Sequence, residues 1–330
     1  MKILFIGGTG VISSACTALA LDQGFELYLL TRGQSFRPIP PGVQSIQADI
    51  RQPDSVVDAL RKHDFDVVVD WIAFNPQHIE IDLSLFQDRT LQYIFISSAS
   101  VYQTPPAGLP VSESTPLYNP IWAYSQAKIA CEERLVAAYR QTGFPITIIR
   151  PSHTYDKTLL PFRGGYTMLG RMLSGQPVIV HGDGTSLWTL THHQDFAKGF
   201  LGLIANPHAI GQAVHITSDE TLTWNQIYSL IAKAAGAEPK IVHVPSDLIA
   251  NYNPDWGASL LGDKAHSMVF DNTKIKQLVP GFQATIPFAR GAREIVSWYL
   301  ANPSRQQLDP EFTASIENIL AAYQLAWPQE

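Results

Sequence analysis

The sequence has few cysteines and no long apolar run, and its charge is not basic. Two cysteines, Cys16 and Cys131, occur in 330 residues and lie far apart in segments that we expect to be helical. This spacing fits neither a disulfide framework nor a metal site, so we expect packed thiols, a reducing compartment and no bound metal. A formal net charge of −6 gives no basis for a nucleic-acid partner. No stretch of about eighteen or more apolar residues occurs, so no membrane span is expected.

The N-terminal segment also lacks the features of a signal peptide. It begins with a short apolar strand, Lys2–Ile6, without a charged start, a long apolar run or a small-residue cleavage site. We therefore expect a soluble cytoplasmic protein. Its length allows one large domain or two smaller ones.

A tyrosine and a lysine lie four residues apart, at Tyr124 and Lys128, within residues 119–142, which we expect to be helical. Pro120 suits the first turn of that helix. The two side chains would share one helix face, and the ammonium would lower the pKa of the phenol from its ordinary value of about 10. Ser98 could then hydrogen-bond the oxygen of a carbonyl or alcohol substrate while Tyr124 moves the proton.

Glycines follow the first strand in the segment Gly7-Gly-Thr-Gly-Val-Ile-Ser13, which precedes a predicted helix that extends to Gln23. A strand, a glycine turn and a helix form the context of the dinucleotide-binding fingerprint. Gly8 and Gly10 can make the tight turn and let backbone N–H groups approach a pyrophosphate at the helix N-terminus. The third position of the fingerprint holds Ser13 instead of glycine. The segment predicts NAD(P) binding.

The end of the second strand, residues 25–30, favours NADP over NAD. An NAD-selective site usually has Asp or Glu here to accept a hydrogen bond from the ribose. This chain has Thr31-Arg32-Gly33, and Arg32 could pair with a 2′-phosphate. The alternative for Arg32 is an exposed loop arginine, so NAD stays open.

Further candidate cofactor residues follow the third and fourth strands, at residues 43–47 and 66–70. Asp49 could accept a hydrogen bond from the adenine amine while Ile50 packs on the ring, although Asp49 could instead cap a helix that begins nearby. Ala73 lies just after the fourth strand, at the sheet edge where the cofactor crevice is expected.

Short strands that alternate with helices predict an α/β fold with a Rossmann-type, doubly wound parallel sheet. Ser98 then lies at the carboxyl end of a central strand, at the same edge as the glycine turn. The less regular second half predicts a smaller, interleaved α+β substrate lobe. We expect the NAD(P)-binding domain at residues 1–156 and about 189–221, and the substrate lobe with the C-terminal helices at about 157–188 and 222–330. The last helix is predicted at residues 309–327.

The chain resembles the extended short-chain dehydrogenase/reductase superfamily, which contains the NAD(P)-dependent epimerase/dehydratase family. The resemblance covers nearly the whole chain. The segments that carry it are Gly7-Gly-Thr-Gly10, Asp49-Ile50, Ser98 with Val101-Tyr102, Tyr124 with Lys128, Arg150-Pro151, Thr191–Ala197 and Phe288–Trp298.

The resemblance implies a role for each of these site residues. Tyr124 would be the catalytic acid/base, Lys128 its electrostatic partner and a ligand of the ribose, and Ser98 the hydroxyl that polarises the substrate. A second set would border the pyrophosphate: Gly7, Gly10, Val11 and Ile12. The cofactor would supply the hydride.

Departures from the family pattern bear on the substrate. Family dehydratases carry an acidic pair directly after the position of Ser98, where this chain has Ala99 and Ser100, which disfavours dehydration. Nucleotide-sugar enzymes usually have an arginine after the Gly-Asp-Gly turn, whereas residues 186–189 here are Ser-Leu-Trp-Thr. Arg163 or Arg171 could substitute for that arginine in binding a substrate phosphate.

We therefore expect an NAD(P)-dependent enzyme that either epimerises a sugar-like substrate or reduces a small ketone or aldehyde. The same three catalytic residues serve both reactions, and the family resemblance favours the epimerase. The alternative is a cofactor-binding relative without turnover, such as an RNA-binding protein like the chloroplast stem-loop-binding proteins, or a regulatory one. Three histidines could reach the cleft, although a single histidine is more often structural: His153, His192 and His193. A homodimer is left open.

Overall fold

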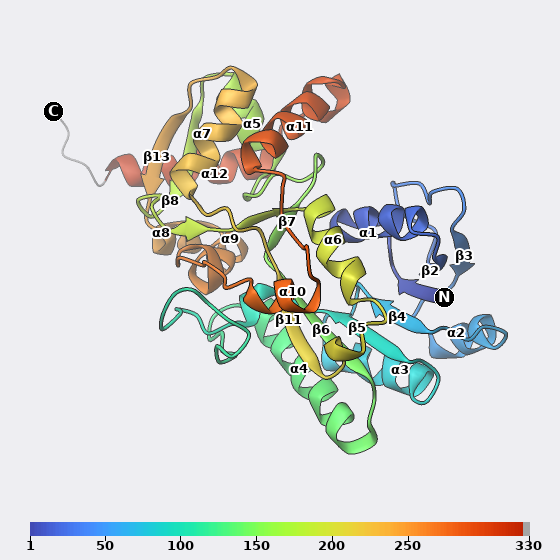
Figure 1. Ribbon diagram of the computed structural model, residues 1–330. Coiled ribbons are helices and arrows are strands. Elements are labelled where there is room, and N and C mark those ends of the chain that lie inside the picture. The colour runs from blue at the N-terminus through green and yellow to red at the C-terminus, as the bar shows by residue number, and fades with distance from the viewer. Residues whose placement is uncertain (326–330) are drawn as a thin grey trace.

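The computed structural model describes residues 1–325, and its centre is a seven-stranded parallel sheet (Figure 1). The strand order is β11-β6-β5-β4-β1-β2-β3. The strands are β1 (Lys2–Ile6), β2 (Glu26–Thr31), β3 (Gln44–Gln47), β4 (Val67–Asp70), β5 (Gln92–Ile96), β6 (Ile146–Pro151) and β11 (Gln212–Ile216). All neighbouring strands are parallel, and the order reverses between β1 and β4. This is the doubly wound Rossmann arrangement, so the predicted fold class is confirmed.

Helices cover both faces of the sheet. Helices α1 (Val11–Asp22) and α6 (His193–Leu203) pack against one another on one face, while α2 (Pro53–Leu60), α3 (Pro76–Phe86) and α4 (Ala123–Thr142) lie on the other (Figure 1). The central strands are therefore buried on both sides. In β1, Ile3 and Phe5 join one core and Leu4 and Ile6 the other. This burial explains why the strands are continuous apolar runs and do not alternate with polar residues.

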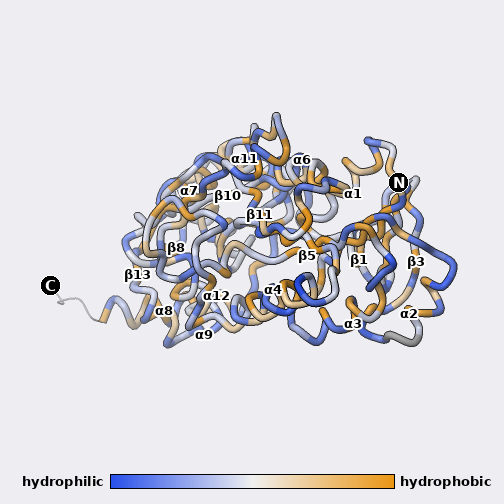
Figure 2. Tube along the Cα trace, turned by 60° about the horizontal axis from the view of Figure 1, so that its bottom comes forward, coloured by the Kyte–Doolittle hydropathy of each residue, from blue (hydrophilic) through white to orange (hydrophobic). Residues whose placement is uncertain are grey.

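A second group of elements lies at the end of the molecule opposite β3, as both views show (Figures 1 and 2). It has its own core, built around buried side chains such as Met168, Trp224 and Phe288. Its strands form three pairs: β7 (His153–Tyr155) with β10 (Leu190–His192), β8 (Pro177–His181) with β13 (Lys240–Val244), and β9 (Leu187–Trp188) with β12 (Leu222–Thr223). Its helices are α5 (Tyr166–Leu173), α7 (Trp224–Ala235), α8 (Ser246–Tyr252), α9 (Pro254–Ser259), α11 (Phe288–Leu300) and α12 (Pro310–Leu325).

The start of α4 (Ala123–Thr142) differs from the sequence expectation. Helix α4 begins at Ala123, so the predicted start at residue 119 is wrong. The Asn119 side chain accepts hydrogen bonds from the backbone N–H groups of Ile121 and Trp122, which forms a turn in place of the first helical turn. The predicted last helix is found as α12; residues 326 and 327 of that prediction lie outside the described residues.

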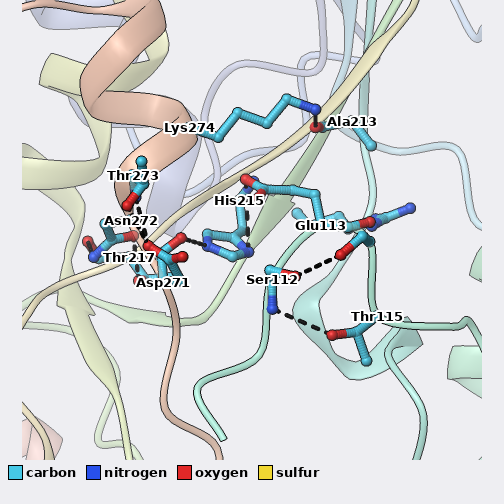
Figure 3. A network of polar contacts seen from close by, with 12 residues as sticks. Ser112, Glu113, Thr115, Ala213, His215, Thr217, Asp271, Asn272, Thr273 and Lys274 are labelled. Carbon is cyan, nitrogen blue, oxygen red and sulfur yellow. Dashed lines mark hydrogen bonds and ion pairs between the residues drawn. The ribbon is translucent and has the colours of Figure 1, made fainter.

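A polar network connects the proline-rich loop before α4 to the end of β11 (Figure 3). His215 donates from Nε2 to the Asp271 carbonyl at 2.8 Å and accepts from the Tyr102 hydroxyl at Nδ1, 2.9 Å away, as the neutral tautomer does. Glu113, from the loop, accepts a hydrogen bond from the His215 backbone N–H at 3.1 Å. These bonds join three segments that are distant in sequence and fix the loop beside the carboxyl edge of the sheet.

No helix in residues 1–325 is long and apolar enough to cross a bilayer. Nor does that part of the chain contain a group of three His, Cys, Asp or Glu side chains that could hold a metal ion. Cys16 and Cys131 are buried free thiols.

Buried histidines should make the protein lose stability in acid. Burial lowers the pKa of His153 to about 3 and the pKa values of His181 and His193 to about 4. In the unfolded chain a histidine titrates at about 6.5, so below that pH the unfolded state binds more protons and is favoured. For His181 we expect the free energy of unfolding to fall by about 2 kcal/mol between pH 7 and pH 5. Urea unfolding at both pH values measures this loss.

The variant His181→Gln isolates the contribution of His181 to the loss of stability in acid. Glutamine retains a donor for the Lys264 carbonyl, to which His181 donates from Nε2 at 3.0 Å, but it does not titrate. Its stability should fall less between pH 7 and pH 5 than that of the wild type, whereas the exposed His208→Gln should match the wild type. Equal losses in H181Q and wild type would contradict this account.

Candidate active site

The three predicted catalytic residues meet at the carboxyl ends of the central strands. Ser98 follows β5 directly and caps the short 3₁₀ helix η1 (Ala99–Val101), where its Oγ accepts a hydrogen bond from the Ser100 N–H at 3.2 Å. Tyr124 and Lys128 lie one turn apart on α4. The Ser98 side chain hydrogen-bonds the Tyr124 phenol, so the two hydroxyl groups that the sequence singled out are adjacent.

The Lys128 ammonium joins α4 to two strand ends. Its Nζ donates to the carbonyls of Ala73 and Ile96, at 2.7 Å each, and lies 4.8 Å from the ring centroids of Phe74 and Phe95. The residue is only 2% exposed. Burial lowers its pKa to about 8, although nearby carboxylates oppose that shift. Lys128 therefore fixes the position of α4 over the ends of β4 and β5.

The pKa of Tyr124 differs in direction from the sequence expectation. Burial raises it to about 12, and the hydrogen bond from Ser98 lowers it only in part. The expected lowering by Lys128 is not found, because the ammonium lies 5.9 Å from the Tyr124 ring centroid and is engaged by the two backbone carbonyls. The phenol is therefore protonated at neutral pH in this structure.

A chain of hydroxyl groups extends behind Ser98. Ser125 donates to Ser100 Oγ at 2.8 Å, and Ser100 Oγ lies 2.9 Å from Ser98 Oγ. Ser100 and Ser125 are both buried. With the contact to Tyr124, Ser100 and Ser125 orient the hydroxyl group of Ser98, and Ser100 stands at one of the two positions where the family dehydratases carry the acidic pair.

A cavity of about 270 Å³ opens beside Ser98 and Tyr124. Four aromatic rings and one pair of adjacent charged side chains stand out among its walls. The lining residues are Ser98, Ala99, Ser100, Trp122, Tyr124, Pro151, Ser152, His153, Trp188, Thr189, Asp263, Lys264, Met268 and Phe270. His153 is thus placed in the cavity wall, as the sequence allowed. His192 instead contacts Glu294, and His193 donates to the Val11 carbonyl.

A larger cavity, of about 500 Å³, lies at the ends of β1, β2 and β4. Its walls are Gly7, Thr9, Leu30, Thr31, Arg32, Gln34, Ser35, Ala48, Asp49, Ile50, Arg51, Ile72, Phe74 and His78. The predicted cofactor residues Gly7, Arg32, Asp49 and Ile50 are therefore brought together here. Ala73 is fully buried between two lining residues, and its carbonyl accepts from Lys128.

The glycine turn fits a dinucleotide phosphate. Gly7 and Gly8 have φ angles of +98° and +101°, and a Cβ at Gly8 would lie 2.4 Å from Leu29 Cδ2. Side chains are thus excluded where the backbone must approach the ligand. Gly10 precedes Val11 and Ile12, which open α1, and its carbonyl accepts from Arg37 Nη1 at 3.1 Å. A buried guanidinium nitrogen in the cavity wall, Arg51 Nη1, has no partner in the described chain.

The alternative role of Asp49 as a helix cap is not found. The residue that caps α2 is Gln52, and it makes no side-chain hydrogen bond. Asp49 Oδ1 instead accepts from the Arg51 backbone N–H at 3.0 Å.

Sequence reasoning missed four charged residues near these cavities: Arg37, Arg51, Asp263 and Lys264. Arg51 follows the predicted Asp49 and Ile50, and a basic residue beside a predicted adenosine site was an available signal. Asp263 and Lys264 lie more than 130 residues from Tyr124 and carry no recognisable motif. Only the folded structure shows that they line the same cavity as Tyr124.

The two arginines proposed to bind a substrate phosphate do not line the cavity. Arg171 is fully buried, donates from Nε to the Pro177 carbonyl at 2.8 Å and pairs with Glu317 at 2.6 Å. Arg163 is exposed and is not among the lining residues. Arg171 thus stabilises the second lobe.

Comparisons with known proteins show the family and the fold of this chain. The family model described as NAD dependent epimerase/dehydratase family matches residues 3–217. The chain is 24% identical over 296 residues to 2'-dehydrokanamycin reductase of Streptomyces kanamyceticus, with 86% of this chain and 80% of that protein covered. It is 28% identical over 268 residues to the chloroplast stem-loop binding protein of 41 kDa b of Arabidopsis thaliana, with 77% and 66% covered.

A solved structure shares the fold. The UDP-glucuronic acid 4-epimerase of Bacillus cereus, in complex with UDP-glucuronic acid and NAD, matches with a TM-score of 0.74 and 20% identity. The match covers 91% of this chain and 99% of that chain.

Replacing Lys128 should reduce stability even without any ligand. Lys128→Met retains an unbranched side chain but leaves the carbonyls of Ala73 and Ile96 without their donor. An unpaired buried polar group costs about 1–3 kcal/mol, and removal of a buried charge offsets part of this, so we expect a net loss of about 2 kcal/mol. Chemical denaturation measures it. The exposed Lys62→Met is the matched control, and a Lys128→Met variant as stable as Lys62→Met would contradict the proposed bridging role.

Proposed function

This chain belongs to the NAD dependent epimerase/dehydratase family, and on that premise we propose that it oxidises or reduces an alcohol or carbonyl compound, with Tyr124 as the acid/base. The observation that carries the proposal is the arrangement of the two cavities. Tyr124 and Ser98 face the smaller cavity, while Lys128 contacts Ala73 at the wall of the larger one. Sugar epimerisation and reduction of a ketone or aldehyde both fit this arrangement.

The hydroxyl groups of Tyr124 and Ser98 can carry out the proton transfer. Since burial keeps the Tyr124 phenol protonated at neutral pH, it can donate to the oxygen of a carbonyl substrate as that oxygen gains negative charge. The Ser98 hydroxyl then stabilises the phenolate that remains, because a hydrogen bond to the charged form lowers its pKa. The same groups act in reverse on an alcohol.

The larger cavity suits a nicotinamide dinucleotide, which when bound supplies or accepts the hydride. The glycine turn at Gly7 and the start of α1 would hold its pyrophosphate, and Asp49 and Ile50 its adenine. NADP is favoured over NAD because the cavity wall presents Arg32 and Arg51 and no carboxylate follows β2. The unpaired Arg51 nitrogen supports an anionic group at this site.

Tyr124→Phe should lower turnover about 10²- to 10⁴-fold, because it removes the transferable proton and retains the ring. The assay is dinucleotide absorbance with any substrate that the wild type turns over, and dinucleotide affinity should be unchanged. Tyr118→Phe, at an exposed tyrosine of the preceding loop, is the control and should retain full activity. Unaltered turnover in Y124F would refute the acid/base assignment.

The identity of the bound dinucleotide tests the cofactor assignment. Freshly purified protein is denatured and any released dinucleotide is identified by mass spectrometry. Retained NAD would favour an epimerase, whose cycle returns its cofactor unchanged, and would refute the role of Arg32. An empty protein that binds NADPH would favour a reductase. Arg32→Ala should then weaken the binding of NADPH about tenfold or more and leave the binding of NADH unchanged, since it removes a charged hydrogen bond. The variant Arg61→Ala, outside the cavity wall, is the control.

Failure to retain or bind any dinucleotide would favour the non-catalytic alternative. The sequence similarity to a stem-loop binding protein makes RNA the relevant ligand for that outcome. The net charge of −6 opposes it.

A further inference from the structure

An adjacent ion pair projects into the wall of the smaller cavity. Asp263 and Lys264 end a π-helix, η3 (Leu260–Lys264), and both line the cavity. Their side chains are 11% and 15% exposed, with Lys264 Nζ 3.3 Å from Asp263 Oδ2. Lys264 Nζ also lies 5.1 Å from the ring centroid of Trp122 and 5.8 Å from that of Trp188. π-Helical turns are rare and frequently occur at functional sites.

The backbone that carries this pair is firmly anchored. The Lys264 carbonyl accepts hydrogen bonds from His181, Ser186 and Trp224, at 3.0, 3.1 and 3.1 Å. The Gly262 carbonyl accepts from Asn119 Nδ2 at 2.7 Å, and a Cβ at Gly262 would lie 2.7 Å from the Cβ of Trp122. Side chains held by such a supporting shell are suited to precise recognition.

The pair lies within electrostatic reach of the catalytic wall. The charge of Asp263 raises the pKa of Tyr124, and the charge of Lys264 lowers that of His153, each as a contribution secondary to burial. The imidazole of His153 makes no side-chain hydrogen bond in the described part of the chain, yet the residue lines the cavity. Its neutral imidazole can therefore donate to or accept from a substrate hydroxyl group.

The charges in this cavity oppose a phosphorylated substrate. Among the residues that line it in the described chain, Lys264 is the only lysine or arginine, and Asp263 is beside it. A phosphate drawn to Lys264 would meet the Asp263 carboxyl group, and an ammonium drawn to Asp263 would meet Lys264. The pair thus presents a positive and a negative charge to the cavity, and it selects against a substrate that carries a net charge of either sign.

The cavity size agrees with a small ligand. The cavity volume is about 270 Å³. A single hydroxylated ring fits a cavity of this volume. Its aromatic walls, including Trp122 and Phe270, suit the apolar faces of such a ring, and the carboxyl, ammonium and imidazole groups suit its hydroxyl groups.

We propose that the substrate of this site is a neutral, polyhydroxylated compound of monosaccharide size, without a phosphate or nucleotide, and that Asp263, Lys264 and His153 recognise its hydroxyl groups. This inference rests on the proposed function, since it places the reacting carbon beside Tyr124. Asp263 and Lys264 act here as specificity-determining residues through opposite charges.

The first test measures binding to the wild-type protein by calorimetry, with the dinucleotide that it binds present in excess. The neutral probes are glucose, galactose and myo-inositol, and the charged ones are glucose 1-phosphate, glucosamine and UDP-glucose. At least one neutral probe should bind about tenfold or more tightly than every charged one, because each charged probe meets a like charge. Tighter binding of glucose 1-phosphate or UDP-glucose, or no binding of any neutral probe, would overturn the inference.

The second test uses two charge variants of opposite effect. Asp263→Asn should raise the affinity for glucose 1-phosphate relative to the affinity for glucose about tenfold or more, because it removes the like charge and leaves Lys264. Lys264→Met should raise the affinity for glucosamine relative to the affinity for glucose by a similar factor. If the pair had a purely structural role, both substitutions would weaken the binding of all probes alike and would not produce these opposite changes. Unchanged probe ratios in both variants would refute the assigned role.

Dinucleotide affinity separates failure of this inference from failure of the proposed function. Asp263 and Lys264 do not line the larger cavity, so both variants should bind the dinucleotide as the wild type does. Loss of charge selection with normal dinucleotide binding and a normal effect of Tyr124→Phe would remove this inference alone. A wild-type protein that binds no dinucleotide would remove the proposed function as well.

Discussion

The Lys128 ammonium holds the parts of this site in one geometry. Its bonds to the carbonyls of Ala73 and Ile96 join α4 to the ends of β4 and β5, so they set the rotation of α4 about its own axis. Tyr124 lies one turn earlier on the helix, and that rotation places it over Ser98. The carbonyl of Ala73 belongs to a segment that also walls the larger cavity. One buried charge therefore connects the sheet, α4 and both cavities.

The same geometry explains why the phenol is not activated by Lys128 in this structure. Two of the three N–H donors of the ammonium bind carbonyls at 2.7 Å, and its nitrogen lies 5.9 Å from the centroid of the tyrosine ring. Burial then dominates the pKa of Tyr124, which rises to about 12. Lys128 thus acts first through position and only second through charge, and the local field on the phenol comes from Ser98 and Asp263.

The central sheet and the meeting of Ser98, Tyr124 and Lys128 were predictable because they depend on local patterns. Apolar runs predicted β1, β2, β3 and β4 within one or two residues, and a glycine turn after β1 and the four-residue spacing of Tyr124 and Lys128 indicated the site. The start of α4 was not predictable, since the Asn119 turn is fixed by a contact with Gly262 from far along the chain. The substrate-facing pair was also missed. Asp263 and Lys264 reach the cavity through tertiary packing and a π-helix, neither of which has a sequence period.

A neutral substrate and a hydroxyl relay are consistent with one another. Ser100 stands at one of the two positions where an acidic pair would put negative charge near the reacting carbon, and its hydroxyl group hydrogen-bonds those of Ser98 and Ser125. Hydroxyl groups donate and accept without a net charge, so they orient one another at little electrostatic cost in a buried site. Adding a carboxylate there would raise the pKa of Tyr124 further, since Asp263 already does so. The ion pair in the opposite wall adds one charge of each sign and therefore no net charge to the cavity, which agrees with the proposed role of Tyr124 as the group whose charge changes during the reaction.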